Sequence, residues 1–111
     1  MSGATPKPGS LEISSEALDD TTRVRLEGEL DLASEHVVEE RLVAIEEQGP
    51  TRIVIDLSGL TFIDSSGLRV LLLADSRARE QGFELVLAPG PEPVQRVFEM
   101  TGALDVLRFE S

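Results

Sequence analysis

The sequence contains no cysteine and only one histidine, and both shortages narrow its chemistry. Without cysteine there is neither a disulfide framework nor a thiolate zinc site, so a cytoplasmic protein is the simplest interpretation. The lone histidine, His36, has no neighbours in the sequence that would complete a catalytic or metal site, and we expect it on the surface. The sequence therefore predicts no metal ion and no cofactor.

Basic residues and long apolar runs are also scarce. Ten lysines and arginines face 21 acids, which gives a formal net charge of −11. Nucleic acid is disfavoured as a partner because phosphates need clustered cations, and anionic membrane surfaces are disfavoured for the same reason. No apolar stretch is long enough to span a bilayer, and the first residues lack the core of a signal peptide. The acidity either aids solubility or suits a basic protein partner.

The length of 111 residues fits one domain, and a hydrophobic content of 41% supports an ordinary core. Residues 1–10 are rich in proline, glycine and serine and have no apolar periodicity. We expect them to form a disordered tail. Residues 11–111 are then the single folded domain.

Alternation of apolar and polar residues predicts two N-terminal strands. Leu11 and Ile13 alternate with polar residues, and turn chemistry follows at residues 19–21. From Val24 to Leu30 the apolar residues face one way and the charged residues face the other. Such alternation is typical of a strand with one wet face, most simply paired antiparallel with the strand before it.

Helical and strand patterns then alternate along the rest of the chain. Ser34 is a candidate N-cap for a helix that stops at Gly49-Pro50. The later segments are a buried strand at 53–57, a helix from Leu68 to Arg79, a strand at 83–88, a helix at 94–101 and a short last strand at 104–109. This order predicts an α/β domain with a mostly parallel mixed sheet of four to five strands, an antiparallel N-terminal strand, and helices packed against the sheet.

The junction between the central strand and the second helix holds an acid, two hydroxyls and a glycine. We expect a turn at Ser58-Gly59, followed by Asp64, Ser65, Ser66 and Gly67 at the helix start. If Ser65 is the N-cap, Ser66 is the first helical residue and its hydroxyl is free, with Gly67 leaving the approach uncrowded. If Asp64 is the cap, both hydroxyls are freer. The helix that follows is apolar almost all round, which indicates either deep packing or a surface that awaits a partner.

A catalytic role for either serine is disfavoured. The motif is not a Gly-x-Ser-x-Gly elbow, and the only histidine is in a different segment. The sequence therefore predicts a binding protein and no enzyme.

Three motifs in order and at matching spacing resemble the STAS domain. They are Gly28-Glu29-Leu30-Asp31, Asp64-Ser65-Ser66-Gly67-Leu68 and Phe98-Glu99-Met100-Thr101-Gly102, and the resemblance covers residues 11–110. Within that family the chain most resembles the bacterial anti-sigma factor antagonists.

The resemblance implies a switch protein. In such antagonists the unmodified form binds an anti-sigma factor that is also a serine/threonine kinase, and so frees the sigma factor. The kinase phosphorylates the second serine of the motif, here Ser66, and a metal-dependent protein serine phosphatase removes the phosphate. Arg69 departs from the small residue, often glycine, that relatives carry, which alters the fit to a partner. The alternative is a STAS module that is never phosphorylated, serving as a scaffold or as a subunit of a lipid-transport complex.

A physical reading of the motif supports such a switch. Phosphate brings about −1.5 to −2 charges, which a helix N-terminus tolerates and an acidic interface does not. Loops at the carboxyl ends of parallel strands gather at one edge of the sheet, where we expect the partner to dock. The expected partner-binding residues are Asp31, Asp64, Ser65, Ser66, Gly67 and Arg69.

Overall fold

The computed structural model describes residues 10–110 of the chain. Its elements, in chain order, are β1 (Leu11–Leu18), β2 (Thr21–Leu30), α1 (Glu35–Glu46), β3 (Arg52–Ile63), α2 (Ser65–Gln81), β4 (Glu84–Ala88), α3 (Glu92–Thr101) and the short 3₁₀ helix η1 (Ala103–Asp105). Within this range no helix combines the length and the hydrophobicity needed to cross a bilayer.

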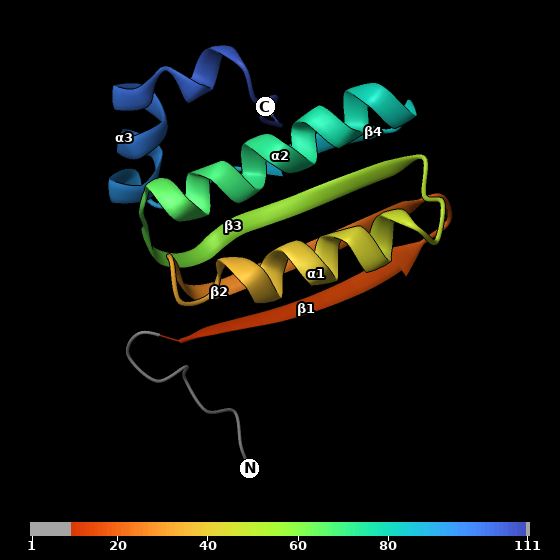
Figure 1. Cartoon of the computed structure of the whole chain (residues 1–111), viewed down its shortest axis with the longest axis horizontal. Coiled ribbons are helices and arrows are strands. Elements are labelled where there is room, and N and C mark those ends of the chain that lie inside the picture. The colour runs from red at the N-terminus through yellow and green to blue at the C-terminus, as the bar shows by residue number, and fades with distance from the viewer. Residues whose placement is uncertain (1–9, 111) are drawn as a thin grey trace.

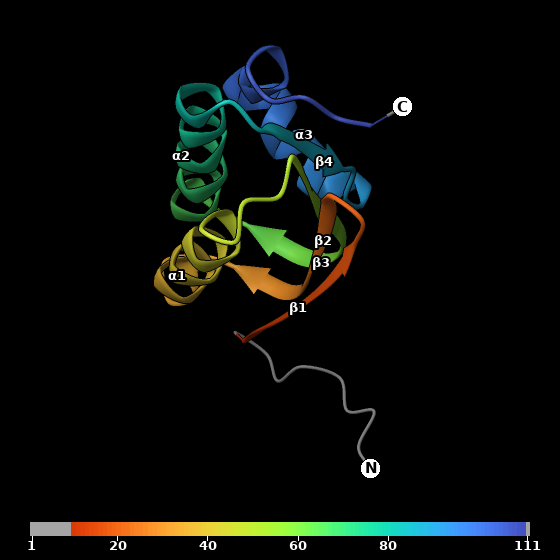
Figure 2. The same ribbon diagram turned by 90° about the vertical axis from the view of Figure 1, so that its right-hand side faces the viewer.

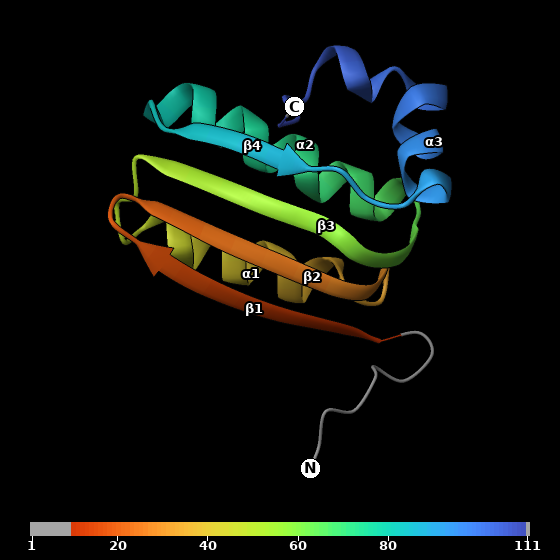
Figure 3. The same cartoon turned by 180° about the vertical axis from the view of Figure 1, so that it is seen from behind.

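The four strands form one mixed sheet in the order β1-β2-β3-β4. β1 pairs antiparallel with β2, while β2, β3 and β4 run parallel. Helices α1 and α2 lie side by side on one face of the sheet, and α3 lies beyond the carboxyl end of β4 (Figure 1). Seen from behind, the strands stand in front of both helices, so within residues 10–110 neither α1 nor α2 covers the other face of the sheet (Figure 3). The predicted α/β architecture with an antiparallel first strand is confirmed.

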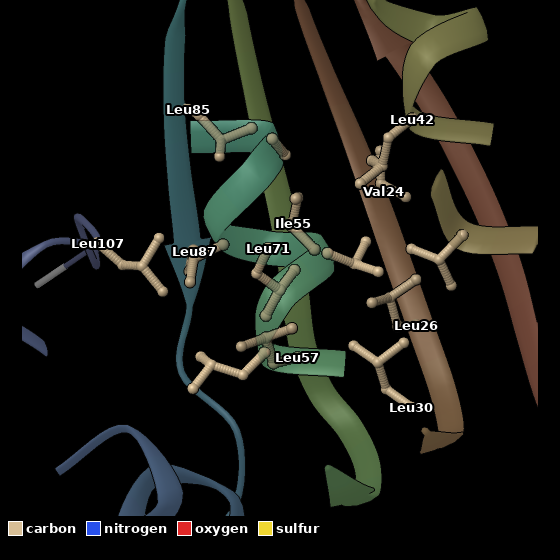
Figure 4. Close-up of a cluster of buried hydrophobic side chains, with 14 of the residues drawn as sticks. Val24, Leu26, Leu30, Leu42, Ile55, Leu57, Leu71, Leu85, Leu87 and Leu107 are labelled. Carbon is tan, nitrogen blue, oxygen red and sulfur yellow. The ribbon is translucent and has the colours of Figure 1, made fainter. Parts of the chain in front are cut away.

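The core lies between the sheet and the pair α1 and α2. The inward residues of β2 and β3, such as Leu26 and Ile55, are fully buried, as the alternation in β2 and the apolar run in β3 predict. Leu71 of α2 is 0% exposed and packs over the parallel strands, in the same buried cluster as Leu57 and Leu87 (Figure 4). Looking along the strands, the two helices cover the same side of the sheet (Figure 2).

The expected turn at Ser58-Gly59 is wrong, because β3 runs unbroken through these residues. The pairing of β2 with β3 shifts register there, as in a β-bulge. Asp56 supports the bulge, since its Oδ1 accepts a hydrogen bond from the Ser58 amide at 2.9 Å. Burial alone would raise the pKa of Asp56, but hydrogen bonds from Ser58 and Arg23 outweigh it and hold that pKa below its usual value.

The last expected strand, at 104–109, is mostly absent. The 3₁₀ helix η1 occupies the first part of this segment, and a single isolated β-bridge joins Phe109 to Leu87 of β4. Phe109 also meets Phe98 of α3 edge to face, with ring centroids 5.3 Å apart. The C-terminal segment is therefore held without a strand, by this ring contact, by backbone hydrogen bonds of Leu87 to Arg108 and Glu110, and by burial of Leu107 in the core.

The expected tail at residues 1–10 lies almost wholly outside the described residues. Ser10 is described, and its carbonyl accepts a hydrogen bond from the Glu29 amide at 3.0 Å. Gly28 is next to this contact, with φ at +115° and no room for a side chain, because a Cβ would lie 2.2 Å from the Ser10 carbonyl oxygen.

Candidate functional site

The carboxyl ends of β2 and β3 lie next to each other. Leu30 pairs with Ile63 in the last register position of the two strands, and the Asp64 amide donates to the Leu30 carbonyl at 3.2 Å. Asp31 and Asp64 each follow directly, so two acids stand at neighbouring strand ends. The N-termini of α1 and α2 open at the same edge of the sheet (Figure 1).

Asp64 is the N-cap of α2. Its Oδ1 accepts a hydrogen bond from the Gly67 amide at 3.0 Å, and the helix begins at Ser65. The assignment of Ser65 as the cap is therefore wrong, and the alternative with Asp64 holds. Within residues 10–110 the amides of Ser65 and Ser66 have no acceptor, so the start of α2 presents two free donors.

The two hydroxyls differ in exposure. Ser65 is exposed, whereas Ser66 is half-buried. Ser66 precedes Arg77 by eleven residues, which is about three turns, so both lie on the same side of the helix. Arg77 bonds to Glu46 of α1, and Ser66 therefore lies on the side of α2 that faces α1. The expectation that Ser65 is tied down as the cap is wrong, and Ser66 is half-buried rather than fully exposed. The choice of Ser66 over Ser65 therefore depends on the family resemblance.

Gly67 is buried rather than set on the approach to the serines. A Cβ at this position would lie 2.5 Å from the carbonyl oxygen of Leu30 and 2.7 Å from its Cγ. The missing side chain lets the start of α2 sit directly on the end of β2. Gly67 therefore positions the two serines by this close packing. The expectation that Gly67 leaves the approach to Ser66 uncrowded is wrong, because Gly67 is buried.

The loop between β2 and α1 is fixed by Asp31 and Ser34. Asp31 Oδ1 accepts from the amides of Ala33 and Ser34, at 3.0 and 3.2 Å. The Ser34 hydroxyl donates to the Glu29 carbonyl at 2.9 Å and accepts from the Asp31 amide at 3.0 Å. Ser34 stands at the N-cap position of α1 as expected, yet its side chain caps no helical amide. Asp31 therefore stabilises this loop, in addition to being a candidate contact for a partner.

Arg69 lies on the outer side of α2 and is exposed. It lines a shallow groove of about 240 Å³ between α1 and α2, together with Glu35, His36, Glu39, Val70 and Leu73. His36 is exposed as expected, and its Nε2 lies 2.9 Å from Oε2 of Glu40. The groove therefore places the Arg69 guanidinium near two acids, Glu35 and Glu39, about one helical turn from the serines.

Two exposed apolar side chains stand at this edge that the sequence-based assignment omits. Leu32, next to Asp31, is 69% exposed, and Phe62, two residues before Asp64, is 47% exposed. The signal was present in the alternation of β3, because Ile63 faces the core and Phe62 must then face outward. We use the term docking edge for the following surface residues: Asp31, Leu32, Phe62, Asp64, Ser65, Ser66 and Arg69.

Removing the cap of α2 should cost stability at Asp64 and not at Ser65. Asp64→Ala is expected to lower the free energy of unfolding by about 1 kcal/mol, because the Gly67 amide loses its acceptor. Ser65→Ala, which removes no cap, should stay within about 0.5 kcal/mol of the parent. Urea denaturation of both variants measures this, and a larger loss for Ser65→Ala than for Asp64→Ala would contradict the cap assignment.

Adding a methyl group at Gly67 should destabilise the fold. Gly67→Ala is expected to lower the free energy of unfolding by about 1–3 kcal/mol, because the Cβ has no room against Leu30. The loss should appear although alanine is the better helix former by about 1 kcal/mol. Thermal denaturation beside Ser76→Ala, at an exposed position of the same helix, separates the clash from a general effect. A Gly67→Ala protein as stable as the parent would disprove the close contact.

The fold and the site define a small α/β domain that presents hydroxyls and acids at one sheet edge. Within residues 10–110 neither Ser65 nor Ser66 has a side-chain hydrogen bond to a base. The edge is thus built as a polar surface with apolar residues, which is the usual make-up of a protein interface.

Comparison with known proteins agrees with this class. The family model described as the STAS domain matches residues 12–111. BtrV of Bordetella bronchiseptica, provisionally named an anti-sigma factor antagonist, is 33% identical over 96 residues, which cover 86% of this chain and 83% of BtrV. The anti-sigma-B factor antagonist of Bacillus subtilis is 34% identical over 85 residues, covering 77% of each chain.

A solved structure shows the same fold. SpoIIAA, an anti-sigma factor antagonist solved in its unphosphorylated form, superposes with a TM-score of 0.75 at 24% identity, over 90% of this chain and 89% of SpoIIAA. The phosphorylated form of SpoIIAA superposes with a TM-score of 0.69 at 22% identity, over 90% of this chain and 92% of that chain. The chain belongs to the STAS domain family, and the two curated relatives above carry names of anti-sigma factor antagonists.

Proposed function

We propose that this chain is an anti-sigma factor antagonist that is switched by phosphorylation of Ser66. The unphosphorylated form binds an anti-sigma factor through the docking edge and so releases a sigma factor. The anti-sigma factor is itself a serine/threonine kinase that modifies Ser66, and a metal-dependent protein serine phosphatase restores the binding form. The role is one of binding in the cytoplasm, without catalysis by this chain.

The observation that carries the proposal is the start of α2. Two serines follow an acid cap at the first helical positions, and their amides have no acceptor in the described part of the chain. A phosphate placed there meets a favourable helix dipole and free donors, so the fold tolerates it. The same phosphate lies beside Asp64 and Asp31 on a surface that a partner must cover. The modification therefore changes binding without unfolding the domain.

Two features of the docking edge support a protein partner. Leu32 and Phe62 supply exposed apolar area close in sequence to Asp31 and Asp64, and interfaces commonly place such anchors among polar groups. The relatives BtrV and the Bacillus subtilis protein carry names that refer to anti-sigma factors.

Release of a sigma factor is the direct test of the proposal. The anti-sigma factor is the kinase-class protein that the unmodified chain captures from its own cells, and its complex with sigma factor is reconstituted. Adding the unmodified chain should shift the sigma factor to the free fraction in gel filtration. A complex that stays intact at a saturating concentration of the chain would contradict the proposal.

A further inference from the structure

We infer that Arg69 is the intramolecular counter-ion of a phosphate on Ser66. This inference deepens the proposed function and rests on it, because it takes Ser66 as the modified residue. Phosphorylation would then do two things at the docking edge: it adds negative charge, and it withdraws the Arg69 guanidinium from contact with the partner.

Arg69 is one of two arginines in residues 10–110 that form no ion pair, and the only one of the two on α2. Nine arginines lie between residues 10 and 110, and seven of them have a carboxylate within 4.0 Å: Arg23, Arg25, Arg52, Arg77, Arg79, Arg96 and Arg108. In this part of the chain only Arg41 and Arg69 lack such a partner. An exposed arginine that stays unpaired in a chain of net charge −11 is available for an added anion.

Helix geometry brings Arg69 within reach of the serines. Ser66 is three residues before Arg69 and Ser65 is four residues before it, which are the two spacings that make neighbours on a helix surface. Side chains on a helix lean toward its N-terminus, so the guanidinium of Arg69 extends back over the first turn. Arg69 also lines the groove toward α1, the side on which Ser66 lies.

The acidic groups around Ser66 favour such a counter-ion. Asp64 caps the same helix, Asp31 stands at the neighbouring strand end, and Glu35, His36 and Glu39 of α1 line the adjoining groove. Glu39 already bonds to Arg77, with Nη1 to Oε2 at 2.8 Å, which leaves Arg77 committed. Arg69 is then the cation of this region that can meet a phosphate without breaking an existing ion pair.

The titration of the phosphate itself measures the pairing. Phosphoserine is placed at position 66 by genetic code expansion, and the second pKa of the phosphate is followed by ³¹P NMR. Arg69→Gln is expected to raise that pKa by roughly half a unit, because an exposed ion pair favours the dianion by a fraction of 1 kcal/mol. Arg41→Gln, at the other unpaired arginine, is the matched control and should leave it unchanged.

Each outcome of this titration is decisive. An equal pKa in the parent and in Arg69→Gln, with both proteins folded by circular dichroism, overturns the inference. A shift seen with phosphoserine at position 65 and not at 66 also overturns it, since the counter-ion then serves the other hydroxyl. Because the phosphate is installed by design, the shift does not depend on a cellular kinase. Absence of phosphate in native cells would thus defeat the proposed function while leaving the titration result in place.

Discussion

Ser66→Asp is expected to weaken binding to the anti-sigma factor by about a hundredfold or more. The new carboxylate lies beside Asp64 on the covered surface, where juxtaposed like charges cost several kcal/mol and each 1.4 kcal/mol is about tenfold in affinity. Ser66→Ala adds no charge and should bind as the parent does. Isothermal titration calorimetry of the two variants with the purified anti-sigma factor gives both dissociation constants.

A second aspartate variant separates site from charge. Ser76 is exposed on α2, about three turns beyond Ser66, so Ser76→Asp adds the same charge to the same helix. It should change the affinity little. If Ser66→Asp and Ser66→Ala bind equally well, or if Ser76→Asp weakens binding as much as Ser66→Asp, the docking edge has been misplaced.

Leu71→Ala should destabilise the domain by roughly 2–5 kcal/mol. Leu71 is 0% exposed and packs on the strands that end at the docking edge (Figure 4). Truncating its side chain to alanine therefore leaves a cavity in the core, which the surrounding structure fills only in part. Chemical denaturation measures the change in the free energy of unfolding. Leu73→Ala, two residues farther on α2 and 42% exposed, is the control and should lose much less. Equal losses would contradict the packing of α2 described above.

The main elements of the fold follow from periodicity in the sequence. Alternation from Val24 to Leu30 predicts a strand with one buried face, and the lack of alternation among the mostly apolar residues 53–57 predicts a strand with side chains buried on both faces. Both are found, because burial of these faces dominates the energetics of the sheet. The strand predicted at 104–109 is wrong. Ala103 and Leu107 are the buried residues of this segment, and their spacing of four is helical rather than that of a strand.

The details of the site depend on tertiary contacts that a sequence pattern does not encode. Asp64, Ser65 and Ser66 can all cap a helix, and the packing of Gly67 on Leu30 selects the first of them. The Ser58-Gly59 pair is typical of a turn, yet Gly59 pairs with Glu27 of β2, which keeps β3 in the sheet, and the mismatch becomes a bulge. The pairing of β3 with β4 ends before this point, at Asp56.

The predicted partner-binding residues also omit the two apolar side chains of the docking edge. Leu32 and Phe62 are flanked by the acids of the two motifs, which draw attention to charge and hydroxyls. Exposure separates them from the core leucines, and exposure is known only once the end of each strand is placed. The same holds for Ser65 and Ser66, whose different exposure follows from the side of α2 that faces α1.

The central claim is that Ser66 carries a regulatory phosphate, and phosphopeptide mapping of the protein from its own cells tests it most directly. The protein is purified with phosphatase inhibitors from cells under growth and stress conditions, and the peptide containing both serines is sequenced by mass spectrometry. We expect a phosphorylated fraction with the phosphate on Ser66 and with Ser65 unmodified. Phosphate on Ser65 alone, or no phosphate under any condition, would contradict the switch, and the latter would favour a STAS scaffold or a lipid-transport subunit.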